Sequence, residues 1–405
     1  MPLPEALRAF QLTRPPADFI DDPYPYYALL REHDPAHALE GGGVLLTRYE
    51  DALTVYRDAR ASSDKTVEFR PKFGDSPLYE HHTTSLVFND PPLHTRVRRL
   101  IMGALNQRAI ARMEDDVTRL VDGLVGEIAQ RRETDLIDAF AARIPVEVIG
   151  NLLEVPHAER GPLRAWSLAI LSALEPAPGS EILERGNRAV SDFLEYLRLL
   201  VADRRKRPGN PESDVLTRLI QGERDGERLT EKELHHNCIF MLNAGHETTT
   251  NLIGNGMWLL LNHPDQMARL RGQPALVNSA IEEMLRYEGP IQLNNRRLVE
   301  PIDLAGKTLA AGAFITIAIG AANRDPAQFP QAERFDVGRN PNRHVAFGQG
   351  AHACAGMNVA RMEARIAFTR LLARFPVIEP AGDPVRDRRI RFRGFRSLPV
   401  RVREK

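Results

Sequence analysis

Phe347-Gly-Gln-Gly-Ala-His-Ala-Cys-Ala-Gly356 is the stretch of this 405-residue chain that decides its fold. Three glycines within ten residues make the backbone permissive to positive φ and let it approach a flat ligand closely. Cys354 follows on this loop, directly before a predicted helix from Met357 to Phe375 that Pro376 stops. Amides at the start of that helix would favour a deprotonated sulfur. The alternative is a buried structural cysteine on a turn.

A long helix upstream carries the second unusual stretch. A capping box at Thr230 starts this helix and Pro264 ends it, which predicts a length on the order of 45 Å. Its middle reads Ala-Gly-His-Glu-Thr-Thr-Thr from Ala244 to Thr250, and an acid with several hydroxyls is costly when buried and unpaired. The alternative is a polar stripe facing solvent, but flanking Leu242 and Ile253 favour burial. An acid and several hydroxyl groups together in the middle of a buried helix disfavour that helix locally, and such a combination predicts a functional site.

Both stretches resemble motifs of one known family. Phe-x-x-Gly-x-His-x-Cys-x-Gly, read from Phe347 to Gly356, resembles the haem-binding signature of the cytochrome P450 family, and Ala-Gly-x-Glu-Thr-Thr is similar to its oxygen-binding motif. Four motifs occur in the family's order, and the resemblance runs from about Asp22 to Val400. It implies a mainly α fold with small β-sheets, the triangular prism of the P450s with a long central helix over the haem. We expect residues 1–405 to form a single domain, since no linker interrupts them.

The resemblance implies a role for each residue of the two motifs. Cys354 would be the axial ligand of the iron in haem b, because a thiolate ligand promotes O–O cleavage. Ala244 and Gly245 would lie against the haem, with the glycine opening the helical groove beside the iron. Thr248 would donate a hydrogen bond to bound oxygen, and Glu247 would relay protons from solvent. Phe347, Gly348 and Gly356 would contact the haem on the side of the cysteine.

The haem propionates need cations or hydrogen-bond donors. His94 and Arg98, four residues apart on one predicted helix face, resemble the family's propionate-binding segment. Arg296 matches the basic residue that precedes a family strand, and His352 stands two residues before the cysteine. Arg297 remains an alternative to Arg296, and each of these basic residues could instead be an ordinary surface charge.

Glu283 and Arg286 lie three residues apart on one predicted helix, which alone describes an ordinary surface pair. They match the family's Glu-x-x-Arg motif, and Arg334 matches the third member of its buried network. The resemblance implies that all three support the haem-binding core and take no part in chemistry.

The implied activity is that of a monooxygenase. It would insert one atom of O2 into a small organic substrate, by hydroxylation or O-dealkylation, with electrons from an iron–sulfur ferredoxin and its reductase. Arg99, Arg343 and Arg361 could form a basic face that steers an acidic ferredoxin, or could be solubilising charges.

Three other functions fit parts of the sequence. They are a peroxygenase, a haem protein that only senses or carries gas, and a helical binding scaffold without haem. The adjacent Glu247 and Thr248 favour molecular oxygen and two electrons, because peroxide-dependent members of the family often lack this acid–alcohol pair. A passive gas binder has no need of a proton relay, and an absorption spectrum would identify a haem-free scaffold.

Composition narrows the partners and the location. The chain has 54 basic and 54 acidic residues, which removes the simplest argument for nucleic acid. The first 20 residues lack a continuous apolar segment, so we expect neither a signal peptide nor a membrane partner. Cys238 and Cys354 are the only cysteines and do not make a disulfide framework, so a cytoplasmic location is expected. Cys238 reads as a small core residue on the long helix.

The substrate pocket is predicted from the positions of its residues. By position, the side chains expected to line it are Leu86, Leu242, Asn243, Ile291, Leu293 and Phe395. The segment 62–90 has no clear period and reads as an irregular lid or a disordered stretch. Asn243 stands where the family usually has an apolar residue, and its amide is expected to bind a polar group of the substrate.

Overall fold

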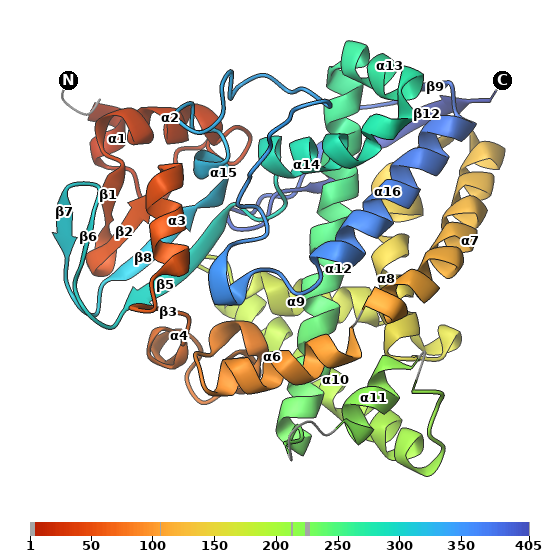
Figure 1. Cartoon of the computed structure of the whole chain (residues 1–405), viewed down its shortest axis with the longest axis horizontal. Coiled ribbons are helices and arrows are strands. Elements are labelled where there is room, and N and C mark those ends of the chain that lie inside the picture. The colour runs from red at the N-terminus through yellow and green to blue at the C-terminus, as the bar shows by residue number, and fades with distance from the viewer. Residues whose placement is uncertain (1–4, 106, 212–213, 223–226, 405) are drawn as a thin grey trace.

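The longest sheet joins residues from both ends of the chain. The computed structural model describes residues 5–105, 107–211, 214–222 and 227–404. Its five-stranded sheet has the order β1-β2-β8-β5-β3, with β2 and β8 parallel and the other pairs antiparallel. The strands are β1 (Ala36–Leu39), β2 (Gly43–Leu46), β3 (Ala61–Ser62), β5 (Leu293–Leu298) and β8 (Phe314–Ala318). Figure 1 shows this sheet beside α3 (Tyr49–Arg57), away from most of the helices.

Three smaller sheets complete the β structure of the described residues. They are formed by β4 (Glu133–Asp135), β12 (Pro399–Arg403) and β9 (Val377–Pro380); by β6 (Ile302–Leu304) and β7 (Lys307–Leu309); and by β10 (Val385–Arg386) and β11 (Phe395–Ser397). The strand β5 was not predicted, because Leu-Asn-Asn-Arg-Arg-Leu is too polar to read as a strand.

Helices make up most of the rest of the chain, so the expected fold class is confirmed. The N-terminal half holds α1 (Glu5–Arg8), α2 (Tyr24–His33), α4 (Thr66–Phe73), α5 (Pro77–Thr84), α6 (Leu93–Ala104), α7 (Gln107–Arg131), α8 (Arg143–Leu152), α9 (Leu163–Ser172) and α10 (Ser180–Lys206). The C-terminal half holds α11 (Val215–Gln221), α12 (Glu231–Asn262), α13 (Pro264–Gly272), α14 (Val277–Tyr287), α15 (Ile319–Ala322) and α16 (Met357–Arg374). Short turns of 3-10 or π-helix are η1 (Glu40–Gly42), η2 (Leu86–Phe88), η3 (Ile137–Ala141), η4 (His157–Glu159), η5 (Pro274–Leu276) and η6 (Gly350–His352).

The predicted long helix is α12, and both of its ends are where the sequence placed them. Thr230 and Glu233 exchange side-chain-to-backbone hydrogen bonds in a full capping box, and Pro264 begins the next helix. The helix has 32 residues and is buried on most sides, as a helix in the middle of a domain should be. Figure 1 shows it running through the helical region, flanked by α16 and α8, both of which contact it.

The expectation for the segment 62–90 was wrong, because it folds into α4, α5 and η2. Both helices are only eight residues long, too short for a readable period, and Pro71 interrupts the pattern of α4. Their stability comes from tertiary packing: Leu78, His81 and His82 are buried, and α5 contacts both α10 and α12.

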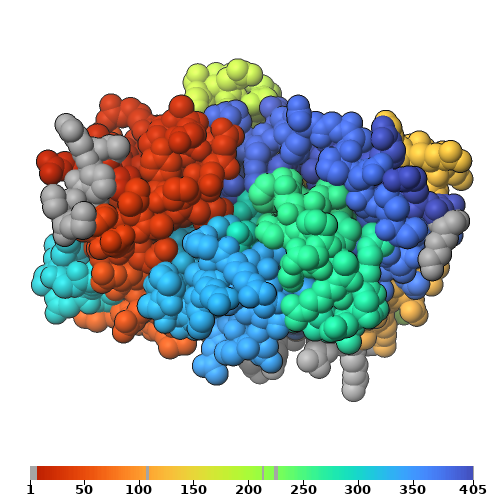
Figure 2. Space-filling model, turned by 90° about the horizontal axis from the view of Figure 1, so that it is seen from above, coloured from red at the N-terminus to blue at the C-terminus, as the bar shows by residue number. Residues whose placement is uncertain are grey.

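The buried apolar residues form one large cluster among the helices and two smaller clusters around the mixed sheet. Ile291 packs against both the helical cluster and one of the sheet clusters. Figure 2 shows N-terminal residues in red sharing one face with later segments in green and blue. These shared surfaces support the proposed single domain. Within the described ranges, no helix is long and apolar enough to cross a membrane.

Candidate functional site

The cysteine loop has the backbone that its glycines predicted. Gly348 and Gly350 adopt left-handed φ angles of 64° and 71°. A Cβ at Gly350 would also lie 2.4 Å from the carbonyl oxygen of Tyr56, so the loop touches the end of α3. The Cys354 amide donates to the Phe347 carbonyl at 2.9 Å and closes the turn.

Cys354 lies directly before α16 and is partly exposed. Burial raises the pKa of its thiol, whereas backbone amides of Gly356 and Met357 and the nearby guanidinium groups of Arg98 and Arg361 lower it. The thiol therefore faces the donors that a thiolate needs, although the protein alone does not ionise it. Cys238, by contrast, is fully buried in the core, where burial raises its thiol pKa to about 12.

Basic side chains from three elements gather beside this loop. His94 and Arg98 come from α6, Arg296 comes from β5, and His352 belongs to the loop. The ring centroids of His94 and His352 lie 3.9 Å apart. Burial, followed by the charges of these neighbours, lowers the pKa of His352 to about 3. We call these four residues the basic cluster.

The structure separates Arg296 from its neighbour Arg297. Arg296 is buried, its guanidinium lies 5.5 Å from the ring of Tyr56, and it donates to the side chain of Asn294 at 3.0 Å. Arg297 is partly exposed and pairs with Phe314 across the sheet. Because side chains alternate along a strand, only Arg296 turns toward the basic cluster.

The basic cluster fits the haem that the resemblance implies. Both ring nitrogens of His94 are buried and lack a hydrogen-bond partner within the described residues. Arg98 donates to the Ala353 carbonyl at 2.7 Å, and neither Arg98 nor Arg296 forms an ion pair with a described carboxylate. Arg296 is a buried cation without an ion pair, Arg98 is a partly exposed one, and the neutral rings of His94 and His352 can donate hydrogen bonds, so the cluster suits an anion from outside the chain, such as the two propionates of haem b. A Cβ at Gly356 would meet nothing within 4 Å, which leaves space beside the sulfur for a flat ring.

The middle of α12 also borders open space. Ala244 is exposed, and Gly245 and Thr248 are partly exposed, on a helix that is otherwise mostly buried. The Thr248 hydroxyl donates to the Ala244 carbonyl at 2.7 Å. A Cβ at Gly245 would approach the Ile149 side chain to 2.8 Å, so close packing against α8 also requires this glycine.

Glu247 is buried on α12 and forms an ion pair with Arg389, from the loop between β10 and β11. Arg389 also pairs with Asp387 at 2.6 Å, and the side chain of Asp387 is 26% exposed. The sequence analysis missed Arg389. A visible signal was the density of charge in this segment, which has six arginines between residues 386 and 396.

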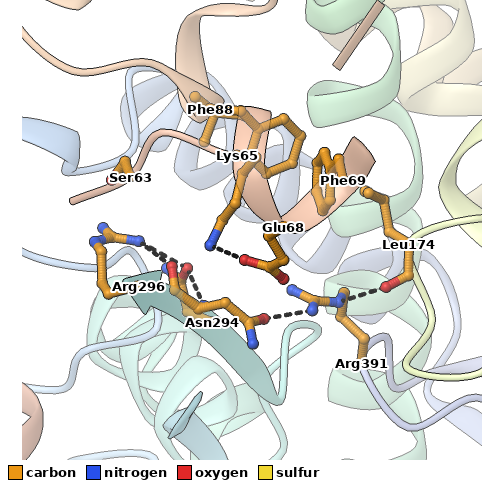
Figure 3. Close-up of a pocket in the computed structure, with 11 residues that line it drawn as sticks. Ser63, Lys65, Glu68, Phe69, Phe88, Leu174, Asn294, Arg296 and Arg391 are labelled. Carbon is orange, nitrogen blue, oxygen red and sulfur yellow. Dashed lines mark hydrogen bonds and ion pairs between the residues drawn. The ribbon is translucent and has the colours of Figure 1, made fainter. Parts of the chain in front are cut away.

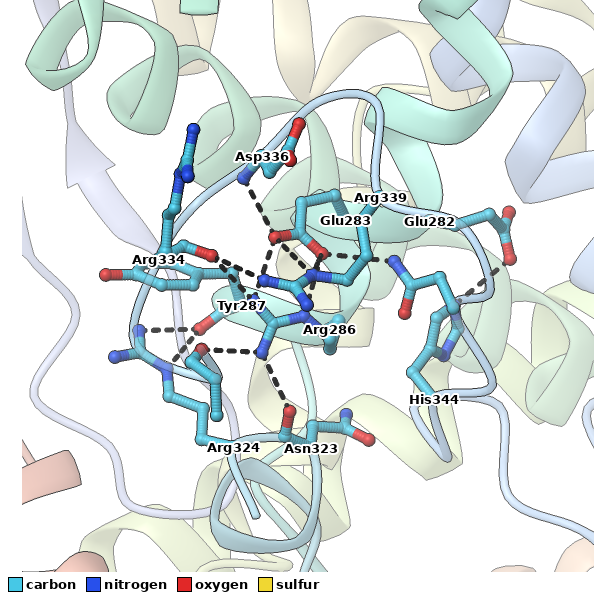
Figure 4. Close-up of polar contacts among 12 residues, drawn as sticks. Glu282, Glu283, Arg286, Tyr287, Asn323, Arg324, Arg334, Asp336, Arg339 and His344 are labelled. Atoms are coloured by element: carbon cyan, nitrogen blue, oxygen red, sulfur yellow. Dashed lines mark hydrogen bonds and ion pairs between the residues drawn. The ribbon is translucent and has the colours of Figure 1, made fainter. Parts of the chain in front are cut away.

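The Glu283–Arg286 pair is fully buried, with hydrogen bonds of 2.7 and 2.8 Å between its groups. The prediction for Arg334 was wrong, because its side chain is exposed and only its carbonyl oxygen accepts a bond from Arg286, at 3.2 Å. Arg339 takes the expected place and donates to both oxygens of Glu283 at 3.1 Å (Figure 4). Four residues separate the two arginines, and the turn between them decides which one points inward.

The residues predicted to line the pocket lie close to α12 and the sheet. Leu86, Leu242, Leu293 and Phe395 are buried in the apolar core, and Ile291 is partly buried. Asn243 is buried beside His81, with 3.4 Å between Asn243 Nδ2 and His81 Nε2, and its carbonyl oxygen has no partner within the described residues. Phe395 packs against Trp258 at 5.6 Å between ring centroids.

The three arginines proposed to steer a redox partner differ in their surroundings. Arg343 is exposed. Arg361 binds both oxygens of Glu282 at 2.7 Å, and Arg99 forms an ion pair with Glu227. Two of the three charges are therefore partly compensated within the chain.

Comparisons with known proteins identify the family of this chain. The family model for cytochrome P450 matches residues 167–401. Cytochrome P450 monooxygenase PikC of Streptomyces venezuelae is 38% identical over 397 residues, covering 95% of this chain and 92% of that protein. The solved structure of P450BioI in complex with hexadec-9Z-enoic acid ligated acyl carrier protein has a TM-score of 0.90 at 32% identity, covering 96% of this chain and 100% of that one. Myxobacterial CYP267B1 in complex with myristic acid has a TM-score of 0.88 at 36% identity, covering 96% and 98%.

Proposed function

This chain belongs to the cytochrome P450 family, and is thus a monooxygenase with haem b as its cofactor. We propose that it oxidises a small organic substrate by hydroxylation or O-dealkylation. The observation that carries this proposal is the pairing of a loop cysteine with a basic cluster that has no carboxylate partners of its own. When bound, haem b supplies the activation of O2, which no side chain can perform.

The residues around the cofactor have separate tasks in this proposal. Cys354 would provide the sulfur ligand of the iron, and the amides that begin α16 would favour its deprotonated form. His94, Arg98, Arg296 and His352 hold the propionates. Phe347, Gly348 and Gly356 shape the loop so that the sulfur reaches the iron. Ala244 and Gly245, at the exposed part of α12, would lie against the haem.

Thr248 and Glu247 deliver protons in this proposal. The Thr248 hydroxyl borders the open side of α12 and can hold a proton there, since its present partner is only the carbonyl oxygen of Ala244. Glu247 is linked through Arg389 to Asp387, whose carboxylate reaches solvent. Arg389 stays protonated, so it positions the Glu247 carboxyl, and a proton would reach that carboxyl through water along this polar chain.

Electrons come from an iron–sulfur ferredoxin and its reductase in this proposal, and exposed Arg343, beside the cysteine loop, is its best-placed steering charge. The two free thiols are in keeping with a reducing cytoplasm. The substrate approaches from the side of η2 and Asn243, whose unpartnered carbonyl oxygen can accept a hydrogen bond from it.

The test is the absorption spectrum of the reduced, carbon-monoxide-bound protein. We expect the red-shifted Soret band of thiolate ligation in the wild type and in Cys238→Ala, and its loss in Cys354→Ser. The Cys238 variant is the matched control, because its buried thiol faces only the core. If Cys354→Ser keeps the band, the ligand assignment is wrong.

A further inference from the structure

A small cavity beside the basic cluster has walls with more positive than negative charge. Its volume is about 30 Å³, room for roughly two water-sized groups. Figure 3 shows it between α4, β5 and the loop after β10. Its charged lining is Lys65, Glu68, Arg296 and Arg391; its polar lining is Ser63, Asn294 and Asn295; and its apolar lining is Phe69, Val87, Phe88 and Leu174.

Glu68 is the only carboxylate that lines the cavity, and it is shared. Lys65 lies 2.5 Å from Glu68, and the lysine side chain is only 4% exposed. In Figure 3 the carboxylate of Glu68 lies between Lys65 and Arg391. Glu68 therefore lies between buried Lys65 and partly exposed Arg391, and Glu175 is a second carboxylate whose charge acts on Arg391.

Arg391 makes its hydrogen bonds to neutral acceptors. It donates to the carbonyl oxygens of Leu174 at 3.0 Å and Leu293 at 3.3 Å, and to the side chain of Asn295. Glu175 lies nearby, but one of its oxygens accepts the backbone amides of Ile390 and Arg391 instead of the guanidinium. The guanidinium of Arg391 thus lacks the bidentate carboxylate partner that its geometry favours.

The apolar part of the lining lies beside these charges. The rings of Phe69 and Phe88 pack edge to face with their centroids 5.2 Å apart. Phe69 lies on α4 and Phe88 on η2; both elements contact α5, which in turn contacts α12. Arg296 and Arg391 lie on opposite sides of the cavity in Figure 3. The Arg296 side adjoins the basic cluster assigned to the haem, which leaves the Lys65 and Arg391 side for another anion.

We propose that Lys65 and Arg391 bind the carboxylate of an amphiphilic substrate, whose apolar body passes Phe69 and Phe88 toward α12. This inference rests on the proposed monooxygenase function and names the class of its substrate. The carboxylate would supply the bidentate partner that Arg391 lacks and would add a negative charge beside Lys65. Its two oxygens match the size of the cavity.

The test compares three twelve-carbon ligands on the haem-loaded protein: dodecanoic acid, methyl dodecanoate and 1-dodecanol. Dissociation constants come from the spin-state change of the ferric protein and, independently, from titration calorimetry. We expect the acid to bind at least about tenfold more tightly than the ester or the alcohol, since a charge-assisted bidentate pair is at stake. Equal affinities would contradict the inference.

Two variants are expected to change the acid-to-ester preference in opposite directions. Arg391→Gln should lower the acid-to-ester preference by about tenfold, whereas Glu68→Gln should raise it, because it removes the internal carboxylate that competes for both cations. Glu68 is partly exposed and Gln keeps its shape, so this variant should fold, with a stability cost because buried Lys65 loses its ion-pair partner; calorimetry on the folded fraction then gives a second test if the Arg391 variant folds poorly. Arg388→Gln is the matched control, since Arg388 lies on the same loop, is exposed, and pairs only at the surface with Asp21.

The outcomes distinguish a substrate carboxylate from a haem propionate in this cavity. If Arg391→Gln loses haem while keeping its preference for the acid, the cavity serves a haem propionate and the inference is overturned. An unchanged preference in Glu68→Gln also overturns it. If the thiolate Soret band is present while acid and ester bind alike, the substrate class is wrong and the proposed function stands; absence of the band contradicts the proposed function itself.

Discussion

Two buried groups of charge, the Glu283 network and the basic cluster beside Cys354, are built in opposite ways. In the network, the carboxylate of Glu283 meets two guanidinium groups, and the remaining donors of Arg286 reach carbonyl oxygens of Asn323, Ala332 and Arg334. In the basic cluster, Arg98 and Arg296 lie with the neutral rings of His94 and His352, and neither arginine forms an ion pair with a described carboxylate. The first is complete within the chain, and the second needs an anion from outside.

The difference teaches how to tell a structural charge cluster from a binding site. A buried charge is tolerated when its partners are present in the fold, and removing one partner leaves an unpaired charge that costs several kcal/mol. A cluster that lacks its partners carries that cost until a ligand binds. Mutations should therefore affect folding in the first case and ligand affinity in the second.

The largest expected effect is on folding. Glu283→Gln leaves Arg286, which is 0% exposed, and Arg339 without their carboxylate, and should lower the free energy of unfolding by about 3–5 kcal/mol. Denaturant unfolding of the haem-loaded protein measures it. The control is Asp116→Asn, which breaks an exposed pair with Arg119 and should cost less than about 1 kcal/mol. Similar losses in both variants would contradict the distinction drawn above.

The next effect is on the cofactor. Arg296→Gln should weaken haem binding by about ten- to a hundredfold, because one charge-assisted hydrogen bond of about 1.5–3 kcal/mol is lost. Arg297→Gln should leave haem binding unchanged, since Arg297 lies on the other side of β5. The rate of haem transfer to an apo-globin measures both. A larger loss in Arg297→Gln would reverse the assignment.

A third set of buried polar groups, His81, His82 and His236, should make the stability of the protein depend on pH. Burial lowers the pKa of His82 to about 3 and that of His236 to about 4, and it lowers the pKa of His81 well below its usual value. The unfolded chain therefore binds more protons than the folded one below about pH 6.5, so stability is full above that pH and falls as the pH drops toward 4. Each histidine should contribute a slope of about 1.4 kcal/mol per pH unit.

His82→Phe isolates one of these groups. The His82 ring lies 5.4 to 5.5 Å from the rings of Phe69, Phe73 and Phe88, a setting in which a phenyl ring can pack. The free energy of unfolding is measured from pH 7 to pH 5. Below about pH 6.5, its slope against pH should be smaller in this variant by about 1.4 kcal/mol per pH unit. An unchanged slope would show that His82 is not the buried neutral group described above.

The smallest effect tests the corrected member of the network. Arg334→Gln removes an exposed side chain and should change the free energy of unfolding by less than about 0.5 kcal/mol. Arg339→Gln removes a direct partner of Glu283 and should cost more than Arg334→Gln. Thermal unfolding of the two variants measures the order. The reverse order would restore the prediction made from sequence.

The sequence predicted those elements whose limits are set locally. Thr230 and Pro264 mark α12, and Pro376 follows the end of α16, because caps and prolines act on their own neighbourhood. The helices α4 and α5 could not be predicted, since eight residues show too little periodicity and depend on packing. Within the site, motif spacing placed Cys354 and the residues of the basic cluster.

The partners that sequence missed are distant in the chain. Arg389 lies more than 140 residues from Glu247, and Arg391 lies more than 300 residues from Lys65, so no local pattern could join them. Arg339 was missed for a different reason. It is close to Arg334, but a turn without periodicity decides which of the two side chains is buried.

The parallel pairing of β2 with β8 carries a cost during synthesis. Val44 lies opposite Ile315, about 270 residues later, so the ribosome must add all of these before the pair can close. At bacterial elongation rates this takes roughly 15 to 50 seconds, during which β2 offers an unpaired edge to other chains. Slow translation or crowding of nascent chains should therefore favour aggregation through this edge, and co-expressed chaperones should raise the yield of folded protein.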